Sequence, residues 1–348
     1  MTFEVKPIMN IEALFTSGHD SFFQIPEYQR LYKWNKDEIN ELWSDLYQAF
    51  TDDKDNYFLG SIITAENRED RYRDIVDGQQ RITTLMILFC VIRDEYPDFN
   101  ISTELKKEVT SDTIKDSIKH RANNRIRFRT DDDSQSDFES YIINDGATKK
   151  ITKLPTMKEL RKENSKYKFM QTAFMFRKLL KEKLSSTEER FKFFNFLFQK
   201  VQVIRIDCKD VNSAITLFQV INTRGLDLET SDLIKSFLIA QIAPSENEKK
   251  NQFKADWNST KQNADDSEIK LDVLINIYQY YALVKEQGKN LYENLKRFFQ
   301  GGYEGTTPPE NSNKAISEIK KFSEYHKDVH GAKDKYVYLL RNTPWPTL

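Results

Sequence analysis

IVDGQQRITT, at residues 75–84, joins a short β-branched run to a long apolar run. Residues 72–76 predict a strand, the Asp-Gly pair predicts a tight turn, and the apolar residues 82–92 are long enough for a buried helix. Such a turn leaves the first backbone N–H groups of the helix unpaired at the positive end of its dipole. The stretch therefore predicts a strand, a turn and a helix that together form an anion site.

Three side chains of the predicted helix start suit a phosphate ligand. Arg81 adds a fixed positive charge, and the hydroxyls of Thr83 and Thr84 can reach a phosphate oxygen or a metal-bound water. A nucleoside triphosphate is the ligand that this combination suggests. The alternative is an ordinary Asp-Gly turn before a helix, which is common and needs no ligand.

The composition is that of a soluble globular protein. The chain has 348 residues, of which 39% are hydrophobic and 31% charged, enough for two domains or one domain with a large appendage. Cys90 and Cys208 both lie in apolar runs, which predicts two buried reduced thiols. Neither a signal peptide nor an apolar run of membrane-spanning length is visible. We therefore expect a cytoplasmic protein without a membrane partner.

The net charge of −1 gives the whole chain no electrostatic bias toward nucleic acid, so any DNA contact must come from local patches. Residues 119–130 and 149–168 are two basic stretches. In the first stretch arginines alternate with apolar residues, which places them on one face of a strand. Such a row suits a DNA backbone and equally suits a charge-protected edge strand. Its members are Arg125, Arg127 and Arg129.

The rest of the pattern alternates strands and helices. Asn35 begins a capping box before an amphipathic helix, and residues 57–64 pair as a strand with residues 72–76. Residues 201–208 predict another strand, and residues 211–221 predict a helix that ends at an Asn-Thr-Arg-Gly sequence. These elements predict an α+β fold.

A composition break after residue 244 suggests two parts. The first, residues 1–244, would carry a helical insertion at about residues 100–200. The second, residues 245–348, has helical patterns throughout and ends without a natural stop signal. We expect a helical extension that is truncated before a further C-terminal domain. The sequence does not decide whether the chain forms homo-oligomers.

Three motifs occur in order along the first part: IPEYQRLYKW at 25–34, FLGSIIT with DIVDGQQRITTL at 58–85, and LFQVINTRGLDLETSDLIKSFLI at 217–239. Together they resemble the N-terminal, DGQQR-motif domain of GmrSD-type, SspE-like modification-dependent restriction enzymes of bacteria. The resemblance covers about residues 10–240. It is specific, because the three motifs keep their order and the DGQQR core is intact.

The resemblance implies a ParB/sulfiredoxin-like mixed-sheet core with large helical insertions. It also implies hydrolysis of a nucleoside triphosphate, GTP or UTP, with Mg²⁺, and sensing of modified double-stranded phage DNA, phosphorothioate or modified base. Cleavage would be done by an HNH nuclease domain, C-terminal or on a separate chain. The alternative is a regulatory module that binds nucleotide or DNA without turnover.

Site roles follow from the resemblance and from chemistry together. Asp77 is a candidate to hold Mg²⁺ or orient water, or only to cap its turn, while Gln79 and Gln80 would position water or a ribose. The expected catalytic residues are Asp77, Gln79, Gln80 and Arg81. The expected nucleotide-binding residues are Gly78, Thr83, Thr84, Asn222, Thr223 and Arg224, and the alternative for the last three is that they only cap a helix. The expected DNA-sensing residues are Tyr28, Gln29, Arg30, Arg125, Arg127 and Arg129.

Two sequence patterns that are absent narrow the predicted activities. The chain has four histidines, and the pair His326 and His330 has no further ligand set around it, so no HNH nuclease site is visible. The Walker pattern GxxxxGK[ST] is absent, which excludes a P-loop ATPase.

Overall fold

The computed structural model describes residues 3–18, 21–67, 70–97, 109–130, 133–160, 164–222, 230–243, 245–283, 291–303 and 305–330. The chain divides into two compact units, residues 1–224 and 225–348. The expected boundary lay twenty residues later, after residue 244. The difference concerns helix α10 (Thr230–Ile239), which packs with the helices that follow it in the second unit.

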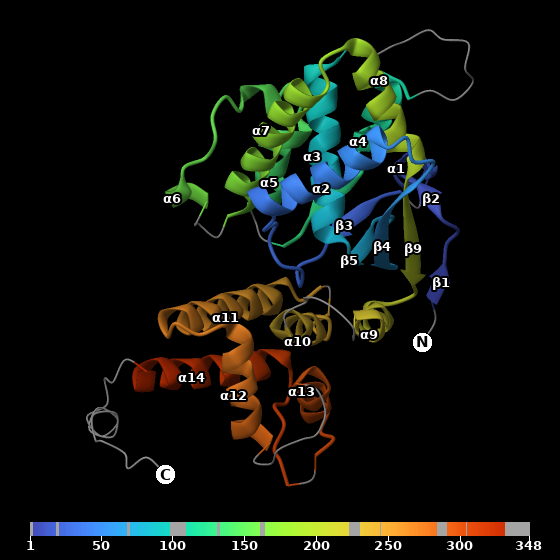
Figure 1. The fold of residues 1–348 in the computed structure, drawn as a ribbon. Helices are drawn as coiled ribbons and strands as arrows, with labels where there is room; N and C mark the ends of the chain where they lie inside the picture. The colour runs from blue at the N-terminus through green and yellow to red at the C-terminus, as the bar shows by residue number, and fades with distance from the viewer. Residues whose placement is uncertain are drawn as a thin grey trace, which may run out of the picture. The chain divides into compact units, whose positions relative to one another are not determined.

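A seven-stranded mixed sheet forms the centre of the first unit (Figure 1). The strand order is β1-β9-β4-β5-β3-β8, and β2 also pairs with β9. β4 runs parallel to β9 and antiparallel to β5, whereas β3 runs parallel to both β5 and β8. This arrangement agrees with the expected α+β class. The strands are β1 (Phe3–Val5), β2 (Met9–Asn10), β3 (Phe23–Ile25), β4 (Tyr57–Ala65), β5 (Arg73–Asp77), β8 (Ile126–Phe128) and β9 (Val201–Cys208).

Helix α3 (Gln79–Glu95) follows β5 directly and lies among the other helices of the unit (Figure 1). Its residues are buried on all sides, as the apolar run predicted. α3 packs against α4 and α7. The other helices of the unit are α1 (Ile11–Thr16), α2 (Lys36–Thr51), α4 (Ser111–Ile118), α5 (Ser134–Phe138), α6 (Met157–Leu160), α7 (Ser165–Lys183), α8 (Thr187–Asn195) and α9 (Val211–Asn222).

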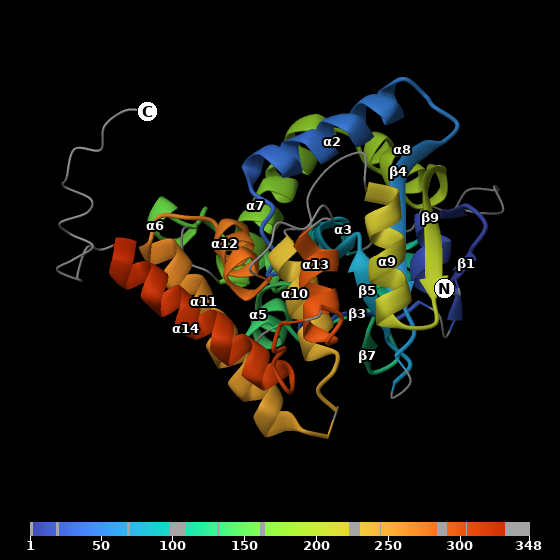
Figure 2. The ribbon, with the colours of Figure 1, turned by 90° about the horizontal axis from the view of Figure 1, so that it is seen from below.

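The region expected as a helical insertion also contributes strands. β8 joins the edge of the main sheet, and β6 (Lys119–His120) pairs with β7 (Asn123–Asn124) as a small separate hairpin. Short helical turns complete the region: η2 (Glu139–Ile143), η3 (Thr148–Lys150) and η4 (Phe196–Lys200). After β9 the chain forms α9, which packs on β4, β5 and β9 (Figure 2).

The second unit is helical in its described residues. Its longest helices, α11 (Asn247–Asp266) and α14 (Ser312–His330), pack against each other, and α12 (Leu271–Leu283) contacts both. α13 (Leu291–Phe299) packs against α10 and α12. Among the described helices of the whole chain, none has the length and apolar character needed to cross a membrane.

Candidate functional site

The turn between β5 and α3 is built on one glycine. Gly78 has φ 91°, a left-handed conformation that residues with a Cβ rarely adopt. A Cβ at this position would also come within 3.2 Å of the Ile62 side chain. Glycine is therefore required here both by the backbone and by the space beside β4.

The first turn of α3 has backbone donors without a hydrogen-bond partner among the described residues. The first backbone bond of the helix runs from the Ile82 N–H to the Gly78 carbonyl, at 3.0 Å. Gly78 has no side chain to cap the preceding N–H groups, and the first turn contains no acidic residue. The N–H groups of residues 79–81 and the positive end of the helix dipole thus remain available to an anion.

Arg81 fastens this turn to the neighbouring strand β4. Its guanidinium donates to the carbonyl oxygens of Leu59 and Ser61, at 3.1 and 2.8 Å. It passes so close to Gly60 that a Cβ there would lie 2.0 Å from its Nη1 atom. Gly60 sits at the bulge of β4 with φ 125°. The sequence analysis did not single out Gly60, although a lone glycine within a strand signals such a close approach.

Asp77 lies beside the same guanidinium. Its Oδ2 atom is 3.5 Å from Arg81 Nη2, and both side chains are about one quarter exposed, at 27% and 26%. Burial raises the pKa of the Asp77 carboxyl, against the opposing effects of Arg81 and the Gly78 N–H. A carboxylate and a guanidinium, both partly accessible, therefore stand next to the uncapped helix start.

Three buried glutamine amides tie the segment after β3 to this junction. Gln80 accepts two backbone N–H bonds from residues 30–34, at 2.9 and 3.3 Å, and donates to a carbonyl of that segment at 3.3 Å. Gln79 donates to the same segment at 2.6 Å, and Gln29 donates to the Val76 carbonyl at 2.8 Å. Their amides hold protein backbone in this structure, so contacts of Gln79 and Gln80 with water or ribose stay a prediction.

Both threonines of the motif point into the protein. Thr84 Oγ1 is 2.7 Å from the Tyr32 hydroxyl, which in turn lies 3.1 Å from Thr172 Oγ1 of α7. Thr83 is fully buried, and its hydroxyl has no hydrogen-bond partner among the described residues. The structure thus places Thr84 in a hydroxyl cluster of the core, away from solvent. That either hydroxyl reaches a phosphate remains a prediction.

Tyr28 is close enough to Asp74 to be affected by its charge, and Asp74 belongs to a polar row that crosses β5, β3 and β8. Asp74 accepts a bond from Gln24 at 2.5 Å, Gln24 accepts one from Arg127 at 2.7 Å, and Arg127 pairs with Asp70 at 2.7 Å. Burial raises the pKa of Asp74 to about 6, although Gln24 and Arg127 oppose this rise. Burial, and then the charge of Asp74, raises the pKa of Tyr28. The Tyr28 hydroxyl is buried without a hydrogen-bond partner among the described residues.

The three arginines of the expected DNA row differ in their surroundings. Arg125 is 1% exposed and pairs with Asp116 at 3.0 Å. Arg127 belongs to the polar row just described, whereas Arg129 and, in part, Arg30 are exposed to solvent. The alternation of arginines with the buried Ile126 and Phe128 is as predicted, but the arginines do not form a uniform exposed row. Contact of any of them with DNA remains a prediction.

The third motif is described only in part. Asn222 is the last residue of α9, and α9 packs on β5, the strand that carries the Asp-Gly turn. Thr223 and Arg224 lie outside the described residues. Their expected role in closing the nucleotide site stays open.

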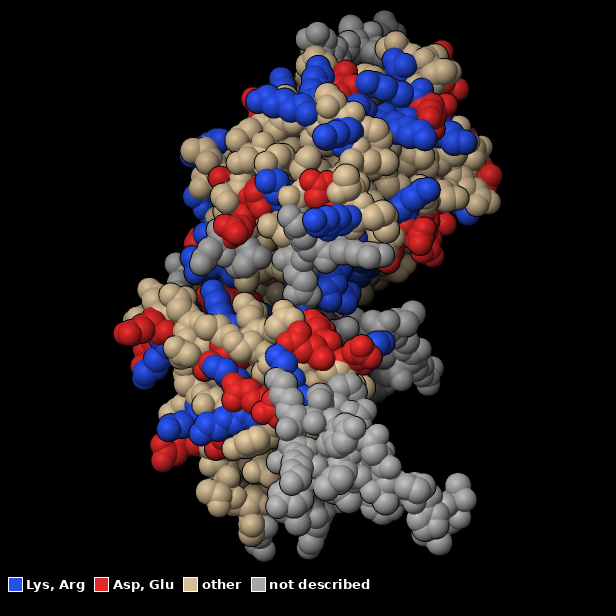
Figure 3. Space-filling view, turned by 90° about the vertical axis from the view of Figure 1, so that its left-hand side faces the viewer, with Lys and Arg blue, Asp and Glu red and all other residues tan. Residues whose placement is uncertain are grey.

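Charge and metal ligands give two further observations. Figure 3 shows Lys and Arg side chains gathered, with interspersed Asp and Glu, on the side of the first unit that carries α6 and α7. Within the described ranges, no group of three or more His, Cys, Asp and Glu residues is placed to hold a metal ion.

Comparison with known proteins identifies one similarity. Residues 11–239 match the family model described as the N-terminal domain of the GmrSD restriction endonuclease. The match spans the three sequence motifs and ends at the last residue of α10. A search of curated proteins found no match.

Proposed function

This chain belongs to the family of GmrSD restriction endonucleases, with residues 11–239 as its N-terminal domain, and on that premise we propose that it binds a nucleoside triphosphate at the first turn of α3. The observation that carries the proposal is the β5–Gly78–α3 junction, with its uncapped N–H groups and adjacent guanidinium. Backbone donors at a helix start suit phosphate oxygens of any nucleotide. We also propose, as the resemblance implies, that the sheet and α3 form a ParB/sulfiredoxin-like nucleotide core.

Hydrolysis is the reaction that we propose for this site. Arg81 is held by two carbonyl bonds, so its positive charge is fixed where phosphates would lie and can stabilise charge during phosphoryl transfer. Mg²⁺ is commonly bound by one or two carboxylates together with substrate phosphates. Asp77, one carboxylate beside the turn, fits that requirement and would hold the ion, which would supply charge neutralisation on the phosphates.

We further propose that the domain senses modified double-stranded DNA and thereby controls an HNH nuclease domain. The segment that follows Tyr28 is bound to the first turn of α3 by the amides of Gln79 and Gln80. Movement of this segment on DNA binding would therefore be transmitted to the residues beside the phosphates. The Tyr28 hydroxyl, buried without a partner in the described chain, is the polar group that a ligand would satisfy.

A phosphate-release assay tests the proposal. The purified chain is incubated with ATP, GTP, CTP or UTP and Mg²⁺, with and without phosphorothioate or base-modified duplex. We expect hydrolysis of at least one nucleotide, with GTP or UTP preferred, and stimulation by modified DNA. Tyr28→Ala should remove the stimulation and leave basal hydrolysis.

Arg81→Ala should reduce the hydrolysis rate on the order of a hundredfold or more, because a fixed charge is lost from the transition state. Arg81→Lys, which keeps the positive charge, and thermal melting of both variants control for the loss of the Arg81 hydrogen bonds to β4. Wild-type hydrolysis by a folded Arg81→Ala variant would contradict the assignment. Nucleotide binding without phosphate release by the wild type would favour the regulatory module instead.

A further inference from the structure

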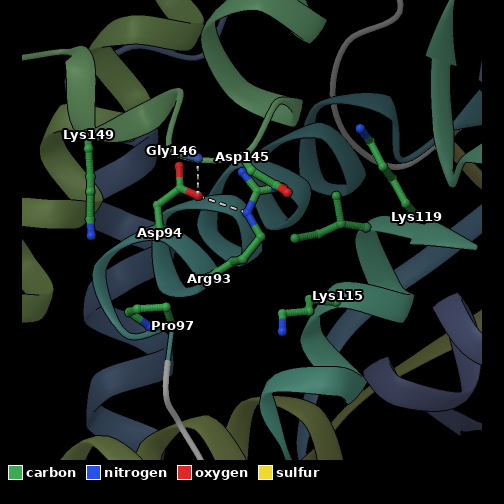
Figure 4. Close-up of a pocket in the computed structure, with 9 residues that line it drawn as sticks. Arg93, Asp94, Pro97, Lys115, Lys119, Asp145, Gly146 and Lys149 are labelled. Atoms are coloured by element: carbon green, nitrogen blue, oxygen red, sulfur yellow. Dashed lines mark hydrogen bonds and ion pairs between the residues drawn. The ribbon is translucent and has the colours of Figure 1, made fainter.

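A cavity of about 440 Å³ lies at the opposite end of α3 from the Asp-Gly turn (Figure 4). This volume falls within the range of about 300–1,000 Å³ typical of ligand pockets. Its walls come from the end of α3, from α4 and β6, and from the loop before η3. Lys115, Lys119 and Lys149 line it, together with Arg93 and Asp94 of α3.

The floor of the cavity is held by a buried hydrogen-bond network. Asp94 accepts bonds from the Gly146 N–H at 3.0 Å, from the Thr148 N–H at 3.0 Å and from the Thr148 hydroxyl at 2.6 Å. Arg93 donates to Asp94 at 2.8 Å and to the carbonyl of Ile143 at 2.7 Å. These bonds fix the loop before η3, and the start of η3 next to Lys149, to the end of α3 before any ligand binds.

The same network determines which charged side chains of the pocket are available to a ligand. The carboxylate of Asp94 is satisfied by Arg93 and by backbone donors, and Asp145 pairs with the same arginine at 3.2 Å. Lys115 lies 3.7 Å from the exposed carboxylate of Asp112. Of the other two lysines, neither forms an ion pair with any described residue. The pocket lining holds four basic and two acidic residues, so its net charge is positive.

We propose that this pocket is a phosphate-binding site, distinct from the first turn of α3. Flexible ammonium groups at the rim of a rigid pocket suit the oxygens of a phosphate, which Lys binds as a point charge. Lys119 and Lys149 begin the two basic stretches of the sequence, and the fold brings them to one cavity. The phosphate can come from a DNA backbone or from a free polyphosphate, and the two sources are separable by experiment.

The test uses the full chain with Lys115, Lys119 and Lys149 replaced by Gln. The control carries Lys54→Gln, Lys178→Gln and Lys192→Gln, which remove the same charge from exposed positions of the same unit outside the pocket. Two probes are titrated at two salt concentrations: a 12-base-pair unmodified duplex and inorganic tripolyphosphate. Neither measurement requires nucleotide hydrolysis, so the result is independent of the function proposed above.

We expect the pocket variant to bind at least one probe about tenfold or more weakly than the control variant. If the source is the DNA backbone, duplex binding falls, and the slope of log affinity against log salt concentration flattens by about 3, since three lysines are removed and each neutralised phosphate contributes ~0.9 to the slope. If the source is a free polyphosphate, tripolyphosphate binding falls instead. Equal affinities of the pocket and control variants for both probes would overturn the proposal.

Discussion

The two ends of α3 use polar side chains in opposite ways. At its start, glutamines and Arg81 bind the protein's own backbone, and the first helix N–H groups have no partner among the described residues. At its end, Arg93 and Asp94 bind each other and the adjoining loop, and instead Lys119 and Lys149 form no ion pair with a described residue. The helix dipole favours an anion at the first end and opposes one at the second.

This contrast separates two ways to hold a phosphate. The start of α3 offers donors whose positions are fixed by backbone geometry, which suits the small and defined changes of a reaction centre. The end of α3 must overcome the negative end of the dipole with side-chain charge, which suits binding without chemistry. The following predictions test whether the two ends differ as the structure indicates.

The largest expected difference is in how much the carboxylates of Asp94 and Asp77 contribute to the stability of the fold. Asp94→Asn should lower the free energy of unfolding by about 3–5 kcal/mol, because it breaks a buried pair and leaves Arg93 with the exposed carboxylate of Asp145 as its ionic partner among the described residues. Asp77→Asn is the matched change at the other end. Because burial raises the folded-state pKa of Asp77, its ionised form opposes folding, and stability from this group is lost as pH rises above its usual pKa. Asp77→Asn should therefore cost little at pH 7.

Urea unfolding of both variants at pH 7 measures this difference. A similar loss of unfolding free energy in the two variants would show that Asp77 contributes as much to the stability of the fold as Asp94 does. The proposed role of Asp77 as a metal ligand would then lose its structural basis.

A smaller difference is expected for two glycines. Gly60→Ala adds a Cβ 2.0 Å from the Arg81 guanidinium at φ 125°, so both strain and displacement of Arg81 should reduce stability, by about 2–3 kcal/mol. Gly146→Ala meets no atom within 4 Å at φ 71°, and only the left-handed backbone costs about 1 kcal/mol. Thermal melting compares the two. Equal melting temperatures would mean that Arg81 moves freely at the bulge of β4.

Local elements of the fold were predictable from the sequence. The strand, turn and helix at residues 75–84 are confirmed, as are the capping box at Asn35 and the strand at 201–208. Each depends on short-range patterns: β-branched runs, a glycine in a turn, or a Ser, Thr, Asn or Asp at a helix start. These patterns act within a few residues, so one sequence suffices to identify them.

Long-range relations were not predictable. Nothing in the sequence pairs β4 with β9, or buries Arg125 against Asp116. The backbone partners of Gln80 are likewise set by the placement of residues 30–34 next to the first turn of α3, which depends on the whole fold. Similarly, Lys119 and Lys149 belong to separate basic stretches, and only the fold places both at one pocket.

Hydrogen exchange at the two ends of α3 tests the central claim most directly. In the free protein the N–H groups of residues 79–81 have no acceptor within the described ranges and should exchange rapidly, whereas the N–H groups of Gly146 and Thr148 are bonded to Asp94 and should exchange slowly. Saturating nucleoside triphosphate with Mg²⁺ should slow exchange at residues 79–81 and leave residues 146–148 unchanged. Unchanged exchange at residues 79–81, in a sample that demonstrably binds the nucleotide, would contradict the assignment of the phosphate site to the start of α3.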